Sequence, residues 1–176
     1  MVNPLAAVMM TAIASTLAST PPTGGPALAA ILQAPGQGFS ASFPAPPQVI
    51  GNAPASDDDA GFWIYTVRNN GAAYTVRIDQ YPNSIRAPAP DQRAYDLLLR
   101  AHAGESSSRL QSERPVEVSG LAGLEGEFVD ATGGGEQMRV LMVGRRVYQV
   151  SYAPAPGHGG GGQGDAFLAS FQISTR

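Results

Sequence analysis

The segment FWIYTVRNNGAAYTVRIDQY, residues 62–81, decides the fold. Both of its halves are rich in β-branched and aromatic residues, and they flank Asn-Asn-Gly at residues 69–71, a strong hairpin signal. In the second half Tyr74, Val76 and Ile78 share one face, while polar side chains share the other. This period of two predicts antiparallel strands in a sheet that is buried on one face.

Strand patterns continue on both sides of this hairpin. Further strands are expected over residues 38–44, 110–118 and 124–131 and in a second hairpin over 137–152, whereas APPQVIGNAPASDDDAG (45–61) is expected to be a loop. The second hairpin turns at Gly144 and Arg145, where a Gly in the first turn position suits a type II′ turn.

Two helices are expected among these strands. Residues 91–103 have side chains on one stripe at helical spacing, and Asp91 is a good N-cap. Asp165 is expected to cap a last helix with an apolar face. The stripes consist of Tyr95, Leu98, Leu99 and His102 in the first helix and of Phe167, Leu168 and Phe171 in the second. The order predicts an α+β fold, an antiparallel sheet of about six or seven strands covered by helices.

The N-terminal residues differ in composition from the rest. Residues 4–18, PLAAVMMTAIASTLA, form an uncharged apolar run, which is shorter than the roughly 20 residues of a transmembrane helix. Small residues suitable for signal cleavage follow this run, so residues 1–30 are expected to be an export signal. An export signal usually begins with a basic segment, but MVN at residues 1–3 carries no Lys or Arg, so a disordered leader is the alternative. Residues 31–37 are expected to be a flexible spacer, and 38–176 a single domain. The mature form is then expected to be extracytoplasmic, periplasmic or secreted, with no stable membrane span.

Composition excludes several kinds of site. All 11 basic residues are Arg, and without Lys the chain can have no Walker A phosphate loop, Schiff-base lysine or Ser-Lys dyad. The absence of Cys excludes disulfides, thiolate nucleophiles and Cys-based zinc sites, and 2 His are too few for a multi-His metal site. The few aromatic residues have no basic stripe beside them, so nucleic-acid binding is not expected.

Four stretches resemble the PsbP/Mog1-like superfamily, and more closely its bacterial members of unknown function. They are GFSASFP (38–44), GLAGLEGEF (120–128), MRVLMVGRRVYQVSY (138–152) and FLASFQI (167–173). The resemblance implies an α/β/α sandwich around an antiparallel sheet, in a domain that is often exported and usually non-enzymatic. It also implies relatives that bind photosystem II in plants and cyanobacteria or a Ran-type GTPase in eukaryotes, but the residues that bind these partners have no match here.

The Gly-rich stretch GHGGGGQGD, residues 157–165, contains the letters HGGG of an esterase oxyanion loop. Amides at Gly159–Gly161 would serve that chemistry only beside a Ser on a G-x-S-x-G elbow, which the chain lacks. The serines Ser106–Ser108 and Ser119 lie in polar loops or turns. Asp165 would repel a phosphate at the following helix. The stretch therefore favours a flexible connection over a catalytic or anion-binding loop.

His102 and the Asp57–Asp59 run are the next candidates. His102 lies on the apolar stripe of its helix, and we expect a boundary His hydrogen-bonded by a neighbour rather than a catalytic base. The three Asp could take up a hard cation such as calcium. They lack the spaced ligands of a known calcium loop, so a solvated acidic loop is favoured.

Two pairs of like-charged residues are also candidate site residues. Arg145 and Arg146 are expected to form an exposed hairpin tip, with a partner contact as the alternative. Glu125 and Glu127 share a strand face, which invites comparison with a catalytic carboxylate pair. We expect that face to be exposed to solvent, where neighbouring carboxylates are ordinary.

We therefore expect an exported, non-catalytic domain that acts through protein contacts or helps an envelope assembly, with no catalytic, cofactor-binding or metal-binding residue assigned. One alternative is a hydrolase or small-ligand enzyme with a cleft near the C-terminal Gly-rich loop. The other is a cation-binding module that uses Asp57–Asp59. An enzyme would need a pocket in which His102 or a carboxylate pair meets a nucleophile or water, whereas a binding module would show an apolar patch or groove on one sheet face.

Overall fold

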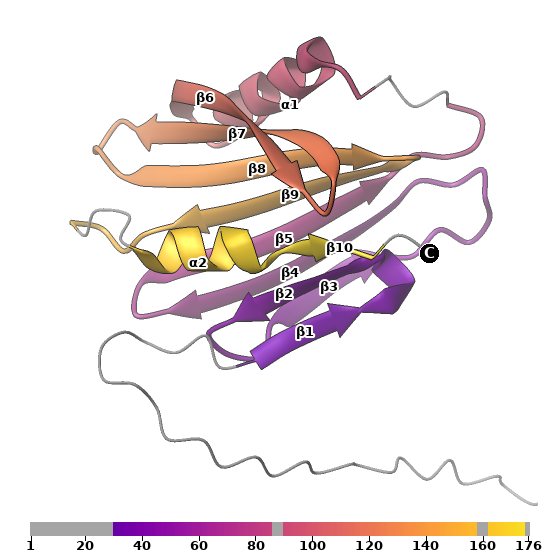
Figure 1. The fold of residues 1–176 in the computed structure, drawn as a ribbon, viewed down its shortest axis with the longest axis horizontal. Helices are drawn as coiled ribbons and strands as arrows, with labels where there is room; N and C mark the ends of the chain where they lie inside the picture. Colours follow the sequence, from indigo (N-terminus) through magenta and orange to yellow (C-terminus); the bar gives the residue numbers. More distant parts are fainter. Residues whose placement is uncertain (1–29, 86–89, 158–161, 175–176) are drawn as a thin grey trace, which may run out of the picture.

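The computed structural model describes residues 30–85, 90–157 and 162–174. They form two antiparallel sheets, a large one of seven strands in the order β3-β4-β5-β9-β8-β7-β6 and a small one of three in the order β1-β2-β10 (Figure 1). The large sheet comprises β3 (Gln48–Asn52), β4 (Gly61–Asn69), β5 (Ala72–Gln80), β6 (Ser108–Val118), β7 (Leu121–Asp130), β8 (Gly135–Val143) and β9 (Arg146–Ala153). The small sheet comprises β1 (Ala30–Ala34), β2 (Phe39–Phe43) and β10 (Gln172–Ile173), and the helices are η1 (Pro35–Gln37), α1 (Gln92–Glu105) and α2 (Gly162–Ser170).

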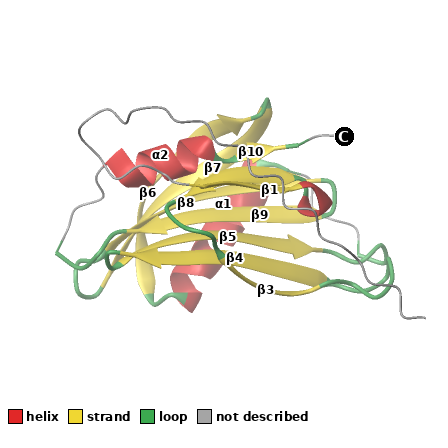
Figure 2. Cartoon of the chain, turned by 90° about the horizontal axis from the view of Figure 1, so that it is seen from below, coloured by secondary structure: helices red, strands yellow, loops and turns green. Residues whose placement is uncertain are grey.

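The large sheet lies between two layers. Helix α1 covers one face, and α2 with the small sheet covers the other (Figures 1 and 2). The larger apolar core lies on the α2 side, where Phe167 packs its ring against Phe43 at 5.2 Å and against Tyr74 at 5.3 Å. Each such buried ring contributes roughly 1.5–3 kcal/mol. The predicted α+β class, with an antiparallel sheet of seven strands covered by helices, is confirmed.

The two predicted hairpins form as their turn residues require. Asn70 and Gly71 have φ of 49° and 81°, and positive values at both positions define the type I′ turn that matches strand twist. At the other hairpin Gly144 has φ of 59°, which suits the first position of the expected type II′ turn. These two turns set the register of β4 with β5 and of β8 with β9.

Helix α1 forms where its cap and its apolar stripe predict it. The Asp91 side chain accepts a hydrogen bond from the Ala94 N–H at 2.9 Å, which satisfies one of the free N–H groups of the first turn. Leu99 is fully buried, and the Tyr95 hydroxyl donates to the Ala122 carbonyl oxygen at 2.8 Å. The helix packs mainly on β6, β7 and β8, so the part of the same face formed by β4, β5 and β9 is left uncovered.

The flexible spacer expected over residues 31–37 is wrong. Residues 30–34 form β1, which pairs antiparallel with β2, and η1 follows directly. Gln37 is held by two hydroxyls: Tyr148 donates to its carbonyl oxygen at 2.8 Å, and Tyr65 donates to its side-chain oxygen at 3.1 Å. The folded part therefore begins by residue 30 rather than at 38. Strand β2 and the two tyrosines supply hydrogen-bond partners that cannot be predicted from the composition of residues 30–37.

Two smaller expectations also differ from the structure, which in addition contains one strand that was not expected. Residues 48–52, expected to be a loop, form β3 because they find a partner in β4. A short last strand, β10, pairs with β2 after α2. Helix α2 begins at Gly162, so Asp165 lies in its first turn instead of capping it. Within the described residues no helix combines the length and apolarity needed to cross a membrane.

Candidate functional site

The part of the large sheet that α1 leaves uncovered is hollowed beside the helix into a cleft of about 540 Å³. Its floor comes from β5 and β9, one wall comes from α1, and Phe62 of β4 stands on the opposite side. The lining of this cleft includes Phe62, Arg77, Asp79, Leu98, His102, Glu105 and Gln149. A smaller hollow of about 290 Å³ shares Arg77, His102, Glu105 and Gln149 with the cleft and continues along the sheet. We refer to both together as the α1 cleft.

An ion pair lies on the floor of the α1 cleft. Arg77 Nε donates to Asp79 Oδ2 at 2.9 Å and its NH2 donates to Oδ1 at 3.0 Å, while Gln149 Nε2 donates to the same carboxylate at 3.2 Å. The hydrogen bonds to Asp79 raise the pKa of Arg77 above its ordinary value, an effect that burial partly opposes. With side chains 43% and 29% exposed, the pair adds at most about 1 kcal/mol to stability. Its two charges largely neutralise each other.

His102 is held at the helix side of the α1 cleft by a carboxylate. Its Nε2 lies 2.9 Å from Glu136 Oε2, and its ring meets Phe128 edge-on at 5.0 Å. This is the neighbour-bonded boundary His that the sequence predicts. Ser106 donates to the carbonyl oxygen of His102 at 2.7 Å and lies 2.8 Å from the Ser108 hydroxyl. Among the described residues, no Ser hydroxyl is thus hydrogen-bonded to the His102 ring.

The Gly-rich loop lies largely outside the part of the chain that the structure describes. Gly159–Gly161 fall in the undescribed range 158–161, so the expected flexible connection stays a prediction.

Ser119, the other Ser of the catalytic alternative, occupies the turn between β6 and β7. Its hydroxyl accepts from the Ile173 N–H at 2.9 Å and donates to Gln172 Oε1 at 3.0 Å. Ser119 therefore holds β10 in place.

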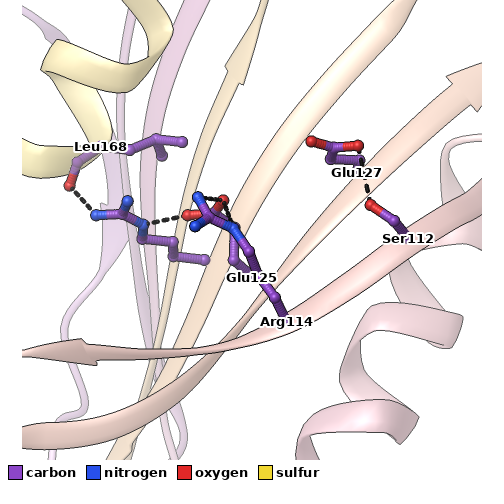
Figure 3. Close-up of polar contacts among 6 residues, drawn as sticks. Ser112, Arg114, Glu125, Glu127 and Leu168 are labelled. Carbon is purple, nitrogen blue, oxygen red and sulfur yellow. Dashed lines mark hydrogen bonds and ion pairs between the residues drawn. The ribbon is translucent and has the colours of Figure 1, made fainter.

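The expectation that Glu125 faces solvent is wrong. The Glu125 side chain is only 2% exposed, and it accepts from Arg114 Nε at 2.8 Å and from Arg139 Nε at 2.6 Å. Glu127 is exposed and accepts from the Ser112 hydroxyl at 2.9 Å instead (Figure 3). The two carboxylates share a strand face but not an environment, because α2 lies over the Glu125 end of it. They form no carboxylate pair.

Arg139 continues this network to the end of α2. Its NH1 donates to the Leu168 carbonyl oxygen at 2.8 Å. Ser170 donates to the carbonyl oxygen before that one at 2.7 Å, and Gln172 donates to the one after it at 3.4 Å. Carbonyl groups in the last turn of a helix have no intrahelical partner, and a positive charge there is favourable. Glu125 and Arg139 thus have a structural explanation, the attachment of α2 to the sheet.

The Asp57–Asp59 run does not converge on one point. The Asp59 carboxylate accepts from the N–H and the hydroxyl of Ser56, both at 2.9 Å, whereas Asp57 faces Arg145, with 4.0 Å between the nearest charged atoms. In the described ranges, no three or more His, Asp or Glu side chains are grouped so as to hold a metal ion. The geometry of the run is that of an exposed acidic loop.

The hairpin tip formed by Arg145 and Arg146 is less exposed than expected. Arg145 NH1 donates to the carbonyl oxygens of Tyr81 at 3.0 Å and of Asp57 at 3.2 Å, because the chain before β4 and the chain after β5 both pass over the tip. Arg146 donates to Gln80 Oε1 at 3.1 Å, and its guanidinium lies 6.0 Å from the Trp63 ring centre. Both residues are partly buried, which corrects the expectation of an exposed tip.

No family model matches the sequence, and no curated protein matches it. Among solved structures, the chain is similar to the solution structure of cyanobacterial PsbP (CyanoP) from Synechocystis sp. PCC 6803. The match covers 89% of this chain and 98% of that one, with a TM-score of 0.59 and 12% sequence identity. The fold is PsbP-like. The resemblance seen in the sequence is confirmed at the level of the fold, and at this identity the likeness shows the fold alone.

The α1 cleft contains residues that were not singled out as candidates from the sequence. Arg77 and Asp79 belong to the polar face of β5, and their alternation with Val76 and Ile78 is visible in the sequence. This alternation indicates that one face of β5 is not fully covered by apolar side chains. Gln149 and Phe62 come from other strands, and only the pairing of β9 and β4 with β5 brings them to the same place.

Proposed function

We propose that this chain is an exported, non-catalytic domain that acts by binding a protein partner, and that the partner docks in the α1 cleft. The observation that carries the proposal is an open cleft on one sheet face, with the exposed Phe62 ring on one side and Leu98 of α1 on the other. Partly exposed apolar side chains around a few polar groups are typical of a binding surface.

The polar groups of the α1 cleft are paired within the fold. Arg77 is bonded to Asp79 and His102 to Glu136, so each of these groups already has a partner of opposite or complementary character. The same groups are suited to orienting a docked chain, which would replace solvent around them.

The charge around the α1 cleft favours a partner segment with a basic side chain. Two carboxylates, those of Asp79 and Glu105, line the cleft together with one guanidinium, that of Arg77. A partner that places an apolar side chain against Phe62 and an Arg or Lys near Glu105 would complement both features.

The test is capture of partners from the native envelope with the full chain as bait. We expect Phe62→Arg to weaken binding of the captured partner at least about 30-fold, which corresponds to about 2 kcal/mol for a central apolar contact. The matched control is Leu97→Arg, since Leu97 is 61% exposed on α1 and does not line the α1 cleft. Equal binding by the two variants would place the partner elsewhere, and no captured protein at all would contradict the proposal.

Export is supported by the apolar run at residues 4–18 and by small residues near the start of β1. Strand β1 begins at Ala30, so a cut just before that residue would leave every described element intact. A cut at that point is compatible with the described strands and helices.

A further inference from the structure

The large sheet has two edges of very different character. One edge is β6, where Arg109, Glu113, Arg114 and Glu117 are exposed, Pro115 removes a hydrogen-bond donor, and the register shifts between Leu110 and Ser112. Charges, Pro and bulges are the features by which proteins prevent an edge strand from pairing with another chain. Edge β6 is therefore protected.

The other edge, β3, has no charge, Pro or bulge within its five residues, although Pro46 and Pro47 come directly before it. All five residues of QVIGN are exposed, none is charged, and β3 pairs with β4 alone among the described strands (Figure 2). Val49 is 53% exposed on the face of the small sheet, and Ile50 is 50% exposed on the face of α1. An uncharged edge with apolar side chains on both faces is a template for a further strand.

We propose that β3 pairs antiparallel with β3 of a second copy of this chain, about a two-fold axis that passes between the two Ile50 residues. The large sheets of the two copies then continue into each other. Ile50 faces its own counterpart on the α1 side, and each Ile50 already lies beside Ile64 of β4. The four side chains make an apolar row across the interface, the cross-strand contact that stabilises antiparallel pairs.

The other face is self-complementary in the same register. Val49 of one copy lies opposite Gly51 of the other. A Cβ at Gly51 would lie 2.8 Å from Cδ1 of Trp63, so the indole ring extends over the glycine. Val49 of the second copy therefore meets the Trp63 ring, where a larger residue at position 51 would stand in the way.

Analytical ultracentrifugation of the full chain tests this pairing. Because one short strand pair makes a small interface, we expect a monomer–dimer equilibrium with a Kd on the order of tens of micromolar. Ile50→Lys, which puts a charge on the exposed edge, is expected to weaken the dimer at least about tenfold. The matched control Ser112→Lys changes an exposed residue of the opposite edge and is expected to leave the equilibrium unchanged.

Cross-linking gives a second measurement that does not depend on how well the lysine variant folds. The chain has no Cys, so Ile50→Cys introduces a single thiol that faces its counterpart across the two-fold axis. Oxidation is expected to give a disulfide-linked dimer with Ile50→Cys and not with Ser112→Cys.

The inference does not rest on the proposed function, since Ile50 lies outside the α1 cleft. A chain that stays monomeric up to about 1 mM, far above that Kd, with no Ile50→Cys cross-link overturns it. A dimer that survives Ile50→Lys, or that Ser112→Lys also weakens, overturns it as well. A monomer whose β3 amides instead shift on addition of an uncharged synthetic strand peptide would assign the edge to a different protein.

Discussion

Among single residues, Glu125 of β7 joins β6 and β8 through two ion pairs. It is a buried carboxylate between two guanidinium groups, and one of these, Arg139, also bonds the end of α2. Removing one partner of a buried ion pair leaves charges uncompensated and costs far more than the pair contributes. The network is therefore expected to make stability sensitive at this position.

We expect Glu125→Ala to lower the free energy of unfolding by about 2–4 kcal/mol, less than for a fully buried pair because Arg114 is 65% exposed. Glu127→Ala is the matched control: it changes an exposed carboxylate on the same strand face and is expected to cost no more than about 0.5 kcal/mol. Urea unfolding of both variants measures the difference. Equal losses would mean that the ion-pair network adds nothing to the stability of the sheet.

Among the elements, the turns are determined by their own residues, whereas the short strands depend on residues far away in the sequence. The type I′ turn at Asn70–Gly71 follows from its own residues. Strands β1, β3 and β10 have 5, 5 and 2 residues and depend on the partners with which they pair. The turn between β7 and β8 is of the local kind, since Asp130 bonds the N–H groups of Thr132 and Gly134, both at 2.8 Å.

This turn gives a pH dependence. The hydrogen bonds from Thr132 and Gly134 hold the pKa of Asp130 below its ordinary value of 3.8. Because the folded-state pKa is the lower one, the carboxylate stabilises the fold above the unfolded-state pKa, and this contribution is lost as the pH falls through the folded-state value. We expect Asp130→Asn to be less stable than the wild type at neutral pH, with a difference that narrows as the pH falls below 3.8. Urea midpoints between these pH values measure it, and a difference independent of pH would contradict the assignment.

On the scale of the whole molecule, the layers determine where a partner can bind. Helix α1 packs mainly on β6, β7 and β8, while α2 and the small sheet cover the opposite face. The α1 cleft and the β3 edge both belong to the part of the large sheet that α1 leaves free. Binding of a partner in the cleft and self-association at the edge would therefore use neighbouring surfaces that share Ile64 and Asn52.

The position of β1 also limits where an export signal could be cut. Because β1 starts at Ala30 and pairs with β2 along its length, we expect the mature N-terminus to lie at or before residue 30. Intact-mass spectrometry of the protein isolated from its native host measures this. A cut within residues 31–37 would remove part of β1 or η1, and an N-terminus that retains Met1 would contradict export by a cleaved signal.

The sequence by itself determined the hairpins, the start of α1 and the α+β class. The reason is that turn residues, the Asp91 cap and the alternation in β5 act within a few residues of where they stand. Only the tertiary structure decided that Glu125 is buried, that His102 bonds Glu136, and that residues 30–34 and 48–52 are strands. In each of these cases the partner lies on another element, and the local pattern is the same with or without it. The α1 cleft also depends on tertiary structure, because it forms where α1 covers one part of the large sheet and leaves the neighbouring strands uncovered.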